Sequence, residues 1–309
     1  MKNLCFAVLL LCAVAGYAMP IASSARSMVP SEIQQLIGVD YRALKDSPTA
    51  MALKQQVLPD NLKELETALK GIGISAERDL DQLNFASFRT EKKGIQTIGV
   101  AAGSFSAKAV LKKMKAKKIA GTKYGTTNIF PMDNGLVMTF LDDNTLAFGT
   151  PASLHSALDT RDGKRPSLDS NPVMTDQMSA VDGAAVWSIL DQKGTQNAIM
   201  SGMGEASRLA DFETIKKRIL GSRYTMGFQN GVSFDMDVVT SDSVSAATLS
   251  SLVKAGVLYK KMTASPAEKT ALEGVSIDSN GSKAQVHFKA DDRQFQSLMR
   301  TNLFAALSK

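Results

Sequence analysis

The chain has 309 residues, of which 44% are hydrophobic and 21% are charged, and its formal net charge is +6. This composition is typical of a globular protein, and so small a positive charge does not indicate nucleic acid as a partner. The two cysteines, Cys5 and Cys12, lie in an N-terminal segment that we expect to be removed, so the mature chain has no disulfide and no thiolate metal site.

The N-terminus has the order of a secretory signal peptide. A lysine at position 2 precedes an apolar run over 4–15, after which small residues appear. That run has about 12 residues, fewer than the roughly 18 to 20 of a membrane-spanning helix. We predict a signal peptide over 1–25, with cleavage after Ala18 or Ala25. Lipid attachment at Cys12 is disfavoured because Leu11 stands where a small residue is expected.

The segment after the signal alternates between strand and helix patterns. We expect a strand at 33–41, helices beginning at Pro48 and Asp60, and a hairpin of strands at 84–90 and 95–101. Ser106 is placed to cap a helix with apolar residues at 107, 110, 111 and 114. Strands at 126–130, 136–141 and 145–149 and a helix at 151–158 complete this half.

The second half repeats this order. We expect a strand at 184–190, helices at 196–203 and 205–220, and a hairpin of strands at 223–228 and 232–239. A helix capped by Ser245, a hairpin of strands at 275–278 and 284–288, and a helix at 291–307 follow. The region 162–182, rich in Pro, Ser and Asp, is the expected join.

Corresponding positions in the halves are separated by a nearly constant distance in sequence. The hairpin turns differ by 231 − 94 = 137 residues, and the capping serines by 245 − 106 = 139. Such an offset is typical of a duplicated unit, although chance similarity is the alternative. We therefore predict an α+β fold with two similar units, at 28–165 and 180–309, each a mainly antiparallel sheet with helices packed on one face.

Several segments resemble uncharacterised exported bacterial proteins. In PSEIQQLIGVDYRALKDSPTAMALKQQ (30–56), the matching residues are Pro30, Val39, Asp40, Leu44, Ser47 and Pro48. VWSILDQKGTQ (186–196) and KKRILGSRYTM (216–226) are similar to recurring segments of the same family. The resemblance implies a cell-envelope protein of tandem α+β units, and it implies no reaction and no catalytic residue.

No motif predicts catalysis, a cofactor or a metal site. The two histidines, His155 and His287, are far apart in sequence, and no H-E-x-x-H pattern occurs. Ser251 begins an S-x-x-K pattern, but the S-D-N and K-T-G elements that such enzymes require are absent. Asp79 and Asp81 lack the glycine and glutamate of a calcium loop. We predict no catalytic residue, no metal ligand and no cofactor.

A lysine-rich helix is the most distinctive feature. Its candidate residues for binding an anionic surface are Lys108, Lys112, Lys113, Lys115, Lys117 and Lys118. No acidic residue occurs from 108 to 123, so this segment could attract lipid headgroups or an acidic polymer. The alternative interpretation is an ordinary solvated helix face.

The leading hypothesis is a non-catalytic exported protein, soluble in the periplasm or outside the cell, with no transmembrane helix after cleavage. It would bind or organise an envelope protein, a lipid or an anionic polymer. One alternative is a carrier of a lipid or hydrophobic ligand, with an apolar cavity between the two units. The other is a hydrolase whose active site brings together distant residues, with His155 or His287 beside a carboxylate.

Overall fold

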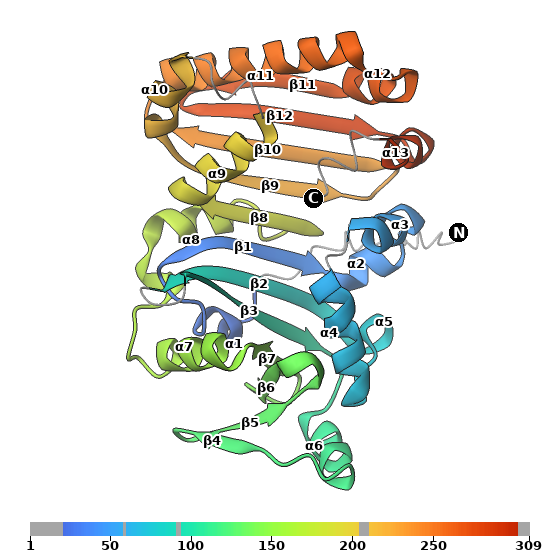
Figure 1. The fold of residues 1–309 in the computed structure, drawn as a ribbon, viewed down its shortest axis with the longest axis vertical. Helices are drawn as coiled ribbons and strands as arrows, with labels where there is room; N and C mark the ends of the chain where they lie inside the picture. Colours follow the sequence, from blue (N-terminus) through green and yellow to red (C-terminus); the bar gives the residue numbers. More distant parts are fainter. Residues whose placement is uncertain (1–20, 58–59, 91–93, 204–209, 302–309) are drawn as a thin grey trace, which may run out of the picture.

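A single antiparallel β-sheet forms the centre of the computed structural model, which describes residues 21–57, 60–90, 94–203 and 210–301. Within these ranges twelve strands follow the order β11-β12-β10-β9-β8-β1-β2-β3-β7-β6-β5-β4 (Figure 1). The neighbouring strands pair antiparallel throughout. The fold is therefore mixed α+β, with helices packed on a large antiparallel sheet.

The strands divide into two groups along the chain. The first group is β1 (Ile33–Asp40), β2 (Leu80–Thr90), β3 (Gly94–Gly103), β4 (Thr122–Tyr124), β5 (Thr127–Pro131), β6 (Val137–Phe140) and β7 (Thr145–Gly149). The second group is β8 (Val186–Asp191), β9 (Ile219–Gly227), β10 (Val232–Thr240), β11 (Val275–Asn280) and β12 (Lys283–Ala290). Asn230 and Gly231, at the β9–β10 turn, have φ angles of 58° and 108°, as a tight hairpin turn requires.

The two groups meet where β1 pairs with β8. Leu36 lies opposite Ile189 and Gly38 opposite Trp187. A Cβ atom on Gly38 would lie 2.3 Å from the indole ring of Trp187, so only glycine leaves room for this ring. From this seam, the strand order is β1-β2-β3-β7-β6 in one direction and β8-β9-β10-β12-β11 in the other.

Thirteen α-helices connect or cover the described strands. Those before the seam strand β8 are α1 (Ser23–Arg26), α2 (Tyr41–Lys45), α3 (Pro48–Val57), α4 (Asp60–Gly71), α5 (Ala76–Asp79), α6 (Ala107–Ala116), α7 (Pro151–Arg161) and α8 (Pro172–Ser179). Those after it are α9 (Gln192–Met203), α10 (Ala210–Arg218), α11 (Ser243–Thr263), α12 (Pro266–Glu273) and α13 (Asp292–Met299). Among the described residues, none of the helices combines the length and hydropathy needed to cross a membrane.

The first half of the sheet has a core on each face. On one face Leu36 and Ala86 pack with residues of α1, α7 and α8. On the other face Leu83 and Ala101 pack with residues of α6. This differs from the expected single covered face, and the reason is that β2 carries apolar side chains at both of its alternating positions.

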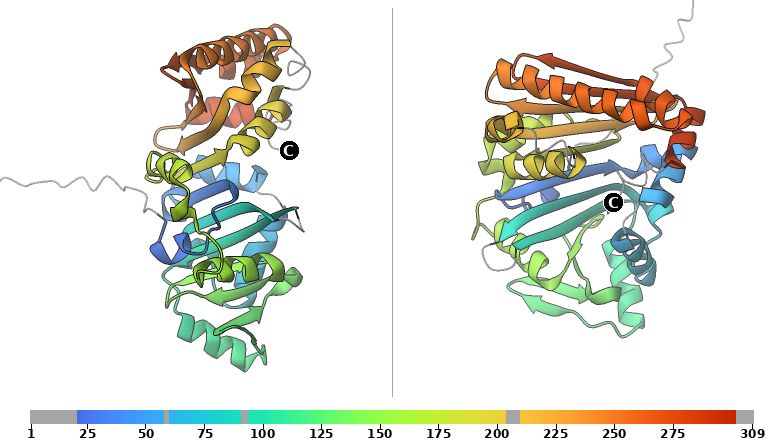
Figure 2. Two further views of the ribbon diagram at one scale, coloured as in Figure 1. Left: turned by 90° about the vertical axis from the view of Figure 1, so that its left-hand side faces the viewer. Right: turned by 45° about the horizontal axis from the view of Figure 1, so that its top comes forward.

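Helices α10 and α11 pack on one face of the strands of the second half. Val238 and Ala284, which are cross-strand partners, pack with Ile215 of α10 and Leu249 of α11. The left view of Figure 2 shows α9 to α12 on one side of these strands. The opposite face of β9, β10 and β12 carries polar residues such as Arg223 at the alternate positions.

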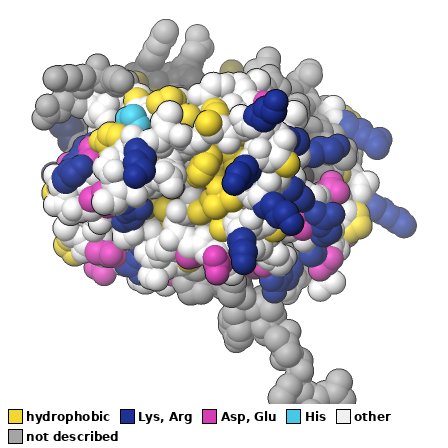
Figure 3. Space-filling model, turned by 90° about the horizontal axis from the view of Figure 1, so that it is seen from below, with side chains coloured by type: hydrophobic (Ala, Val, Ile, Leu, Met, Phe, Trp, Pro, Cys, Tyr) yellow, Lys and Arg dark blue, Asp and Glu magenta, His cyan; other side chains and the backbone are white. Residues whose placement is uncertain are grey.

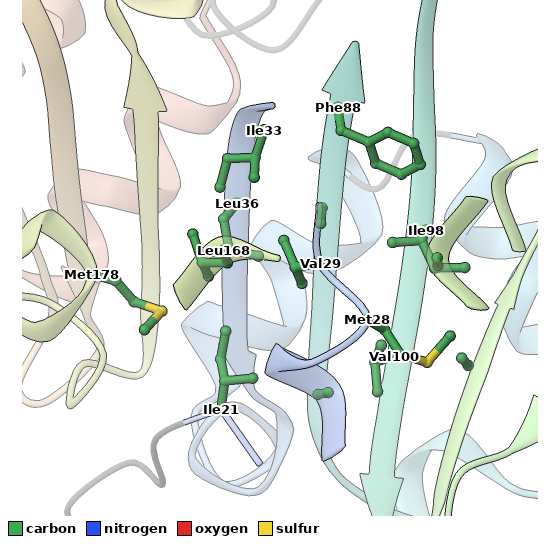
Figure 4. Packing of buried hydrophobic residues seen from close by; sticks show 14 of the residues in the cluster. Ile21, Met28, Val29, Ile33, Leu36, Phe88, Ile98, Val100, Leu168 and Met178 are labelled. Atoms are coloured by element: carbon green, nitrogen blue, oxygen red, sulfur yellow. The ribbon is translucent and has the colours of Figure 1, made fainter. Parts of the chain in front are cut away.

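The segment around α1 is part of the core. Ile21, Ala25 and Met28 are 5%, 1% and 0% exposed, and they belong to the cluster that includes Leu36. In Figure 4, Ile21 lies over β1, Met28 lies over β3, and Val29 lies between these two positions. A signal peptide that ended at Ala25 would remove two of these side chains. The alternative cleavage position, after Ala18, lies outside the described residues, as do Cys5 and Cys12.

Several expected boundaries change in the structure. Asp242, and not Ser245, caps α11, because its carboxylate accepts a hydrogen bond from the Ser245 amide. Strand β9 begins at Ile219, where a helix was expected to continue to 220. The expected join at 162–182 contains α8. Helix α13 ends at Met299, and 302–309 lie outside the described residues.

We predict that Ile21→Ala lowers the free energy of unfolding by about 2–4 kcal/mol, because it leaves a cavity in a closely packed core. Ser23→Ala, on the exposed side of α1, should change it by less than about 0.5 kcal/mol. Urea denaturation of both variants provides the measurement. N-terminal sequencing of the exported protein should then find a mature chain that retains Ile21; a first residue at Arg26 would contradict this prediction.

Candidate functional site

The lysine-rich helix α6 is held to the sheet by its apolar side. Ser106 caps it by accepting a hydrogen bond from the Ala109 amide. Val110 and Met114 are buried in the cluster that includes Leu146. Ala107 is buried as well, and Leu111 packs against the same cluster, so this apolar side directs the lysines of α6 to solvent.

All six candidate lysines are exposed, and two of them have a structural contact. The ammonium groups of Lys113 and Lys117 donate hydrogen bonds to the carbonyl oxygens of Gly73 (3.3 Å) and Gly71 (2.7 Å). These carbonyls lie at and just after the C-terminus of α4, where positive charge is favourable. Lys113 and Lys117 therefore join α6 to α4.

The other four lysines have no hydrogen-bond or ion-pair partner among the described residues. They are Lys108, Lys112, Lys115 and Lys118. Lys118 follows the helix with φ 58°, the left-handed conformation that ends many helices. In Figure 3, which shows the lower end of Figure 1, Lys and Arg side chains gather on the side where α6 lies. We name Lys108, Lys112, Lys115 and Lys118 the α6 basic face.

A hollow of about 400 Å³ lies beside the α4–α6 contact. Gly71, Ile72, Lys117, Met132 and Asp133 are among its lining residues. It contains one basic and one acidic side chain, so its charge favours neither an anion nor a cation.

The face of β9, β10 and β12 opposite to α10 and α11 carries a row of polar side chains across three strands. Arg223 of β9 donates to Asp237 of β10 (2.8 Å), and Gln285 of β12 donates to the same carboxylate (2.9 Å). Burial by itself would raise the pKa of Asp237, but the hydrogen bonds from Gln285 and Arg223 and the charge of Arg223 hold it below the usual value.

The histidines lie in different environments. His287 Nδ1 is 2.6 Å from Asp235 Oδ1, and both side chains are about half exposed. Ser276 of the edge strand β11 lies directly opposite His287. His155 stacks on Tyr124 with 3.9 Å between the ring centroids. The structure thus brings His287 into contact with the carboxylate of Asp235.

The other motifs have local roles. The Ser251 hydroxyl donates to the Ala247 carbonyl of its own helix (2.9 Å), as expected for a helix-surface serine. Asp79 pairs with Arg78, and Asp81 with Arg42. In the part of the chain that the structure describes, no group of three or more His, Cys, Asp or Glu side chains is placed to hold a metal ion.

A cleft that the sequence did not indicate lies beside the seam. It has a volume of about 600 Å³ at the ends of β8, β9 and β10. Its polar lining includes Thr225, Ser233 and Lys289, and its apolar lining includes Ala184 and Phe228. These residues come from four strands or adjoining loops, so only tertiary structure brings them together.

No protein-family model matches the chain, and no curated protein matches it. Among solved structures, crystal form III of TP0453 has a TM-score of 0.50 at 9% identity, covering 89% of this chain and 97% of that chain. Crystal form I of TP0453 has a TM-score of 0.49 at 8% identity, covering 94% and 98%. At these identities, the likeness to form III concerns the fold alone.

We predict that Lys117→Ala lowers the melting temperature by about 1–3 °C, because α4 loses the hydrogen-bond donor at its C-terminus. Lys112→Ala, on the same helix and without such a contact, is the matched control and should leave the melting temperature unchanged. Circular dichroism melts of the two variants make the comparison. Equal melting temperatures for both variants would contradict a structural role for Lys117.

Proposed function

We propose that this chain is an exported, non-catalytic protein of the cell envelope that docks on a membrane surface rich in anionic lipid through the α6 basic face. The observation that carries the proposal is the set of four exposed lysines with no acidic partner among the described residues. The signal-like order of the N-terminal sequence supports export to the periplasm or the exterior.

The electrostatics of α6 favour such docking. Each lysine near an anionic lipid surface contributes about 1 kcal/mol, so four lysines together are sufficient for reversible binding. No acidic residue lies between 108 and 123 to weaken this attraction. Lys113 and Lys117 hold the helix against α4. Because α6 is already in place, binding does not carry the entropic cost of ordering this helix.

We also propose that the two halves are similar units from a duplication, at about 28–165 and 180–309. The strand order outward from the seam is the same in both halves, which supports this proposal. The helices α6 and α11 also correspond, because α6 follows the β2–β3 hairpin and α11 follows the β9–β10 hairpin. Helix α11 has only three lysines, Lys254, Lys260 and Lys261. The basic face therefore belongs to the first unit and is not a consequence of the shared architecture.

We predict that replacing Lys108, Lys112, Lys115 and Lys118 with Gln weakens binding to vesicles by at least about tenfold, since four charge contacts are lost. Vesicles of phosphatidylcholine with 30% phosphatidylglycerol and vesicles of phosphatidylcholine alone, compared by co-sedimentation, provide the measurement. Unmodified protein should bind the anionic vesicles, and less so as salt rises.

The matched control replaces Lys254, Lys260 and Lys261 of α11 with Gln and should keep full binding. Equal binding to neutral and anionic vesicles, or equal loss in both multiple variants, would contradict the proposal. Selective binding to an acidic polysaccharide in place of vesicles would redirect it to an envelope polymer, and co-purification of one protein in stoichiometric amount would redirect it to a protein partner.

Carriage of a lipid inside the core is not favoured. The described strands form one sheet and not two facing sheets. The apolar gap beside Ile21, Leu36, Ala86 and Val100 has a volume of about 10 Å³, which is too small for an acyl chain.

Hydrolysis is the second candidate function, and one observation favours it. Asp235, His287 and Ser276 lie in line across β10, β12 and β11, with His287 contacting Asp235. In this order Asp235 would orient the imidazole, which would accept the Ser276 proton as the hydroxyl attacks a carbonyl.

We predict that, if this candidate function holds, His287→Ala lowers the rate of p-nitrophenyl acetate hydrolysis by about a hundredfold, which is typical of losing a general base. His155→Ala is the control and should leave the rate unchanged. Stopped assays of purified variants give the rates. Indistinguishable rates for the two variants and the unmodified chain would remove the hydrolase.

A further inference from the structure

We propose that the cleft beside the seam binds a small amphiphilic anion, with its charged group at Lys289 and its apolar chain against the β9–β10 turn. The cleft has a volume of about 600 Å³, within the range of small-molecule sites. It lies near the meeting of the two halves, whereas α6 lies at one end of the long axis of the molecule (Figure 1). The inference is therefore independent of docking through α6.

The polar part of the cleft comes from three adjacent strands. Lys289 of β12 and Ser233 of β10 are direct cross-strand partners. Thr225 of β9 lies on the same face, since it is two residues before Gly227, the partner of Ser233. An ammonium group and two hydroxyl groups can all donate hydrogen bonds to the same anionic group.

The charges around the cleft favour an anion. Lys289 is the one charged residue in the lining, and it has no hydrogen-bond or ion-pair partner through its side chain among the described residues. Along the chain, acidic residues flank the lining at Asp182, before Gly183, at Asp235, two residues after Ser233, and at Asp291, two residues after Lys289. The Asp291 carboxylate accepts a hydrogen bond from the Gln294 amide, because Asp291 caps α13. The Asp235 carboxylate contacts His287, with 2.6 Å between Oδ1 and Nδ1.

The rest of the lining is apolar or without side chains. Ala43 of α2, Ala184 and Phe228 supply apolar contacts. Gly183 and Gly227 leave the cleft wide, and a Cβ atom on Gly183 would meet no atom within 4 Å. A ligand with one anionic group and a short apolar chain fits these surfaces, because the chain gains by leaving water while the charge stays beside Lys289.

The test uses decanoate as the probe and 1-decanol as its uncharged analogue, both below their aggregation concentrations, in titration calorimetry with the full mature chain. We expect saturable binding of one decanoate per chain and clearly weaker binding of 1-decanol. Lys289→Gln should weaken decanoate binding by about tenfold through loss of the ion pair. Gly183→Phe should abolish it by filling the cleft, without strain on the backbone.

Three controls test whether decanoate binds in the cleft and not elsewhere on the protein. Lys283→Gln changes a lysine of the same strand and the same face outside the cleft and should bind decanoate as the unmodified chain does. The four-lysine variant of α6 should also bind normally. Trp187, the single tryptophan, lies opposite Thr225, so a brominated decanoate in the cleft should quench its fluorescence.

The proposal is overturned by the absence of saturable binding to the folded chain, by equal affinity for decanoate and 1-decanol, or by equal affinity of the unmodified chain, Lys289→Gln and Gly183→Phe. Circular dichroism melts establish that each variant is folded. A loss of vesicle binding in the α6 variant with normal decanoate binding would support both proposals separately.

Discussion

The hydrogen-bonded pairing of β1 with β8 is the constraint on which the rest of the structure depends. Without it, each half would have an open strand edge with unpaired backbone groups. Two contacts strengthen the seam: Gly38 admits the ring of Trp187, and Arg89 of β2 reaches across β1 to Asp191 of β8 (2.5 Å) and to Gln34 (3.0 Å). This pairing turns two sheets into one and decides which surfaces lie close together.

The continuous sheet gives its two halves different faces and therefore different surfaces. The first half is covered on both sides, since β2 is apolar at both alternating positions, and its lysines are carried outward on α6. In the second half, α10 and α11 pack on one side of the strands, and the other side of β9, β10 and β12 carries a row of hydrogen-bonded polar residues that includes Asp237. The cleft at Lys289 lies where this polar side meets the seam, far along the sheet from the α6 basic face.

Local patterns predicted much of the secondary structure. The apolar spacing of α6 and its cap at Ser106 were readable because both depend on residues within one or two turns. The hairpin at Asn230-Gly231 was readable because its turn needs positive φ angles. The local pattern does not identify the cap of α11, because Asp242 and Ser245 are both good capping residues and the backbone conformation selects Asp242.

The sequence by itself determined the mixed α+β composition, the order of the strands other than β4, and the exposure of the lysines on α6, because each follows from periodicity and turn chemistry over short stretches. Only the tertiary structure decided that the halves share one sheet, that Ile21 belongs to the core, that Lys117 binds a carbonyl of α4, and that His287 meets Asp235. These contacts join residues that are tens of positions apart in the chain. Many pairs of residues would be chemically compatible, and strand register and helix packing select the pairs that form. No short stretch of sequence contains that information.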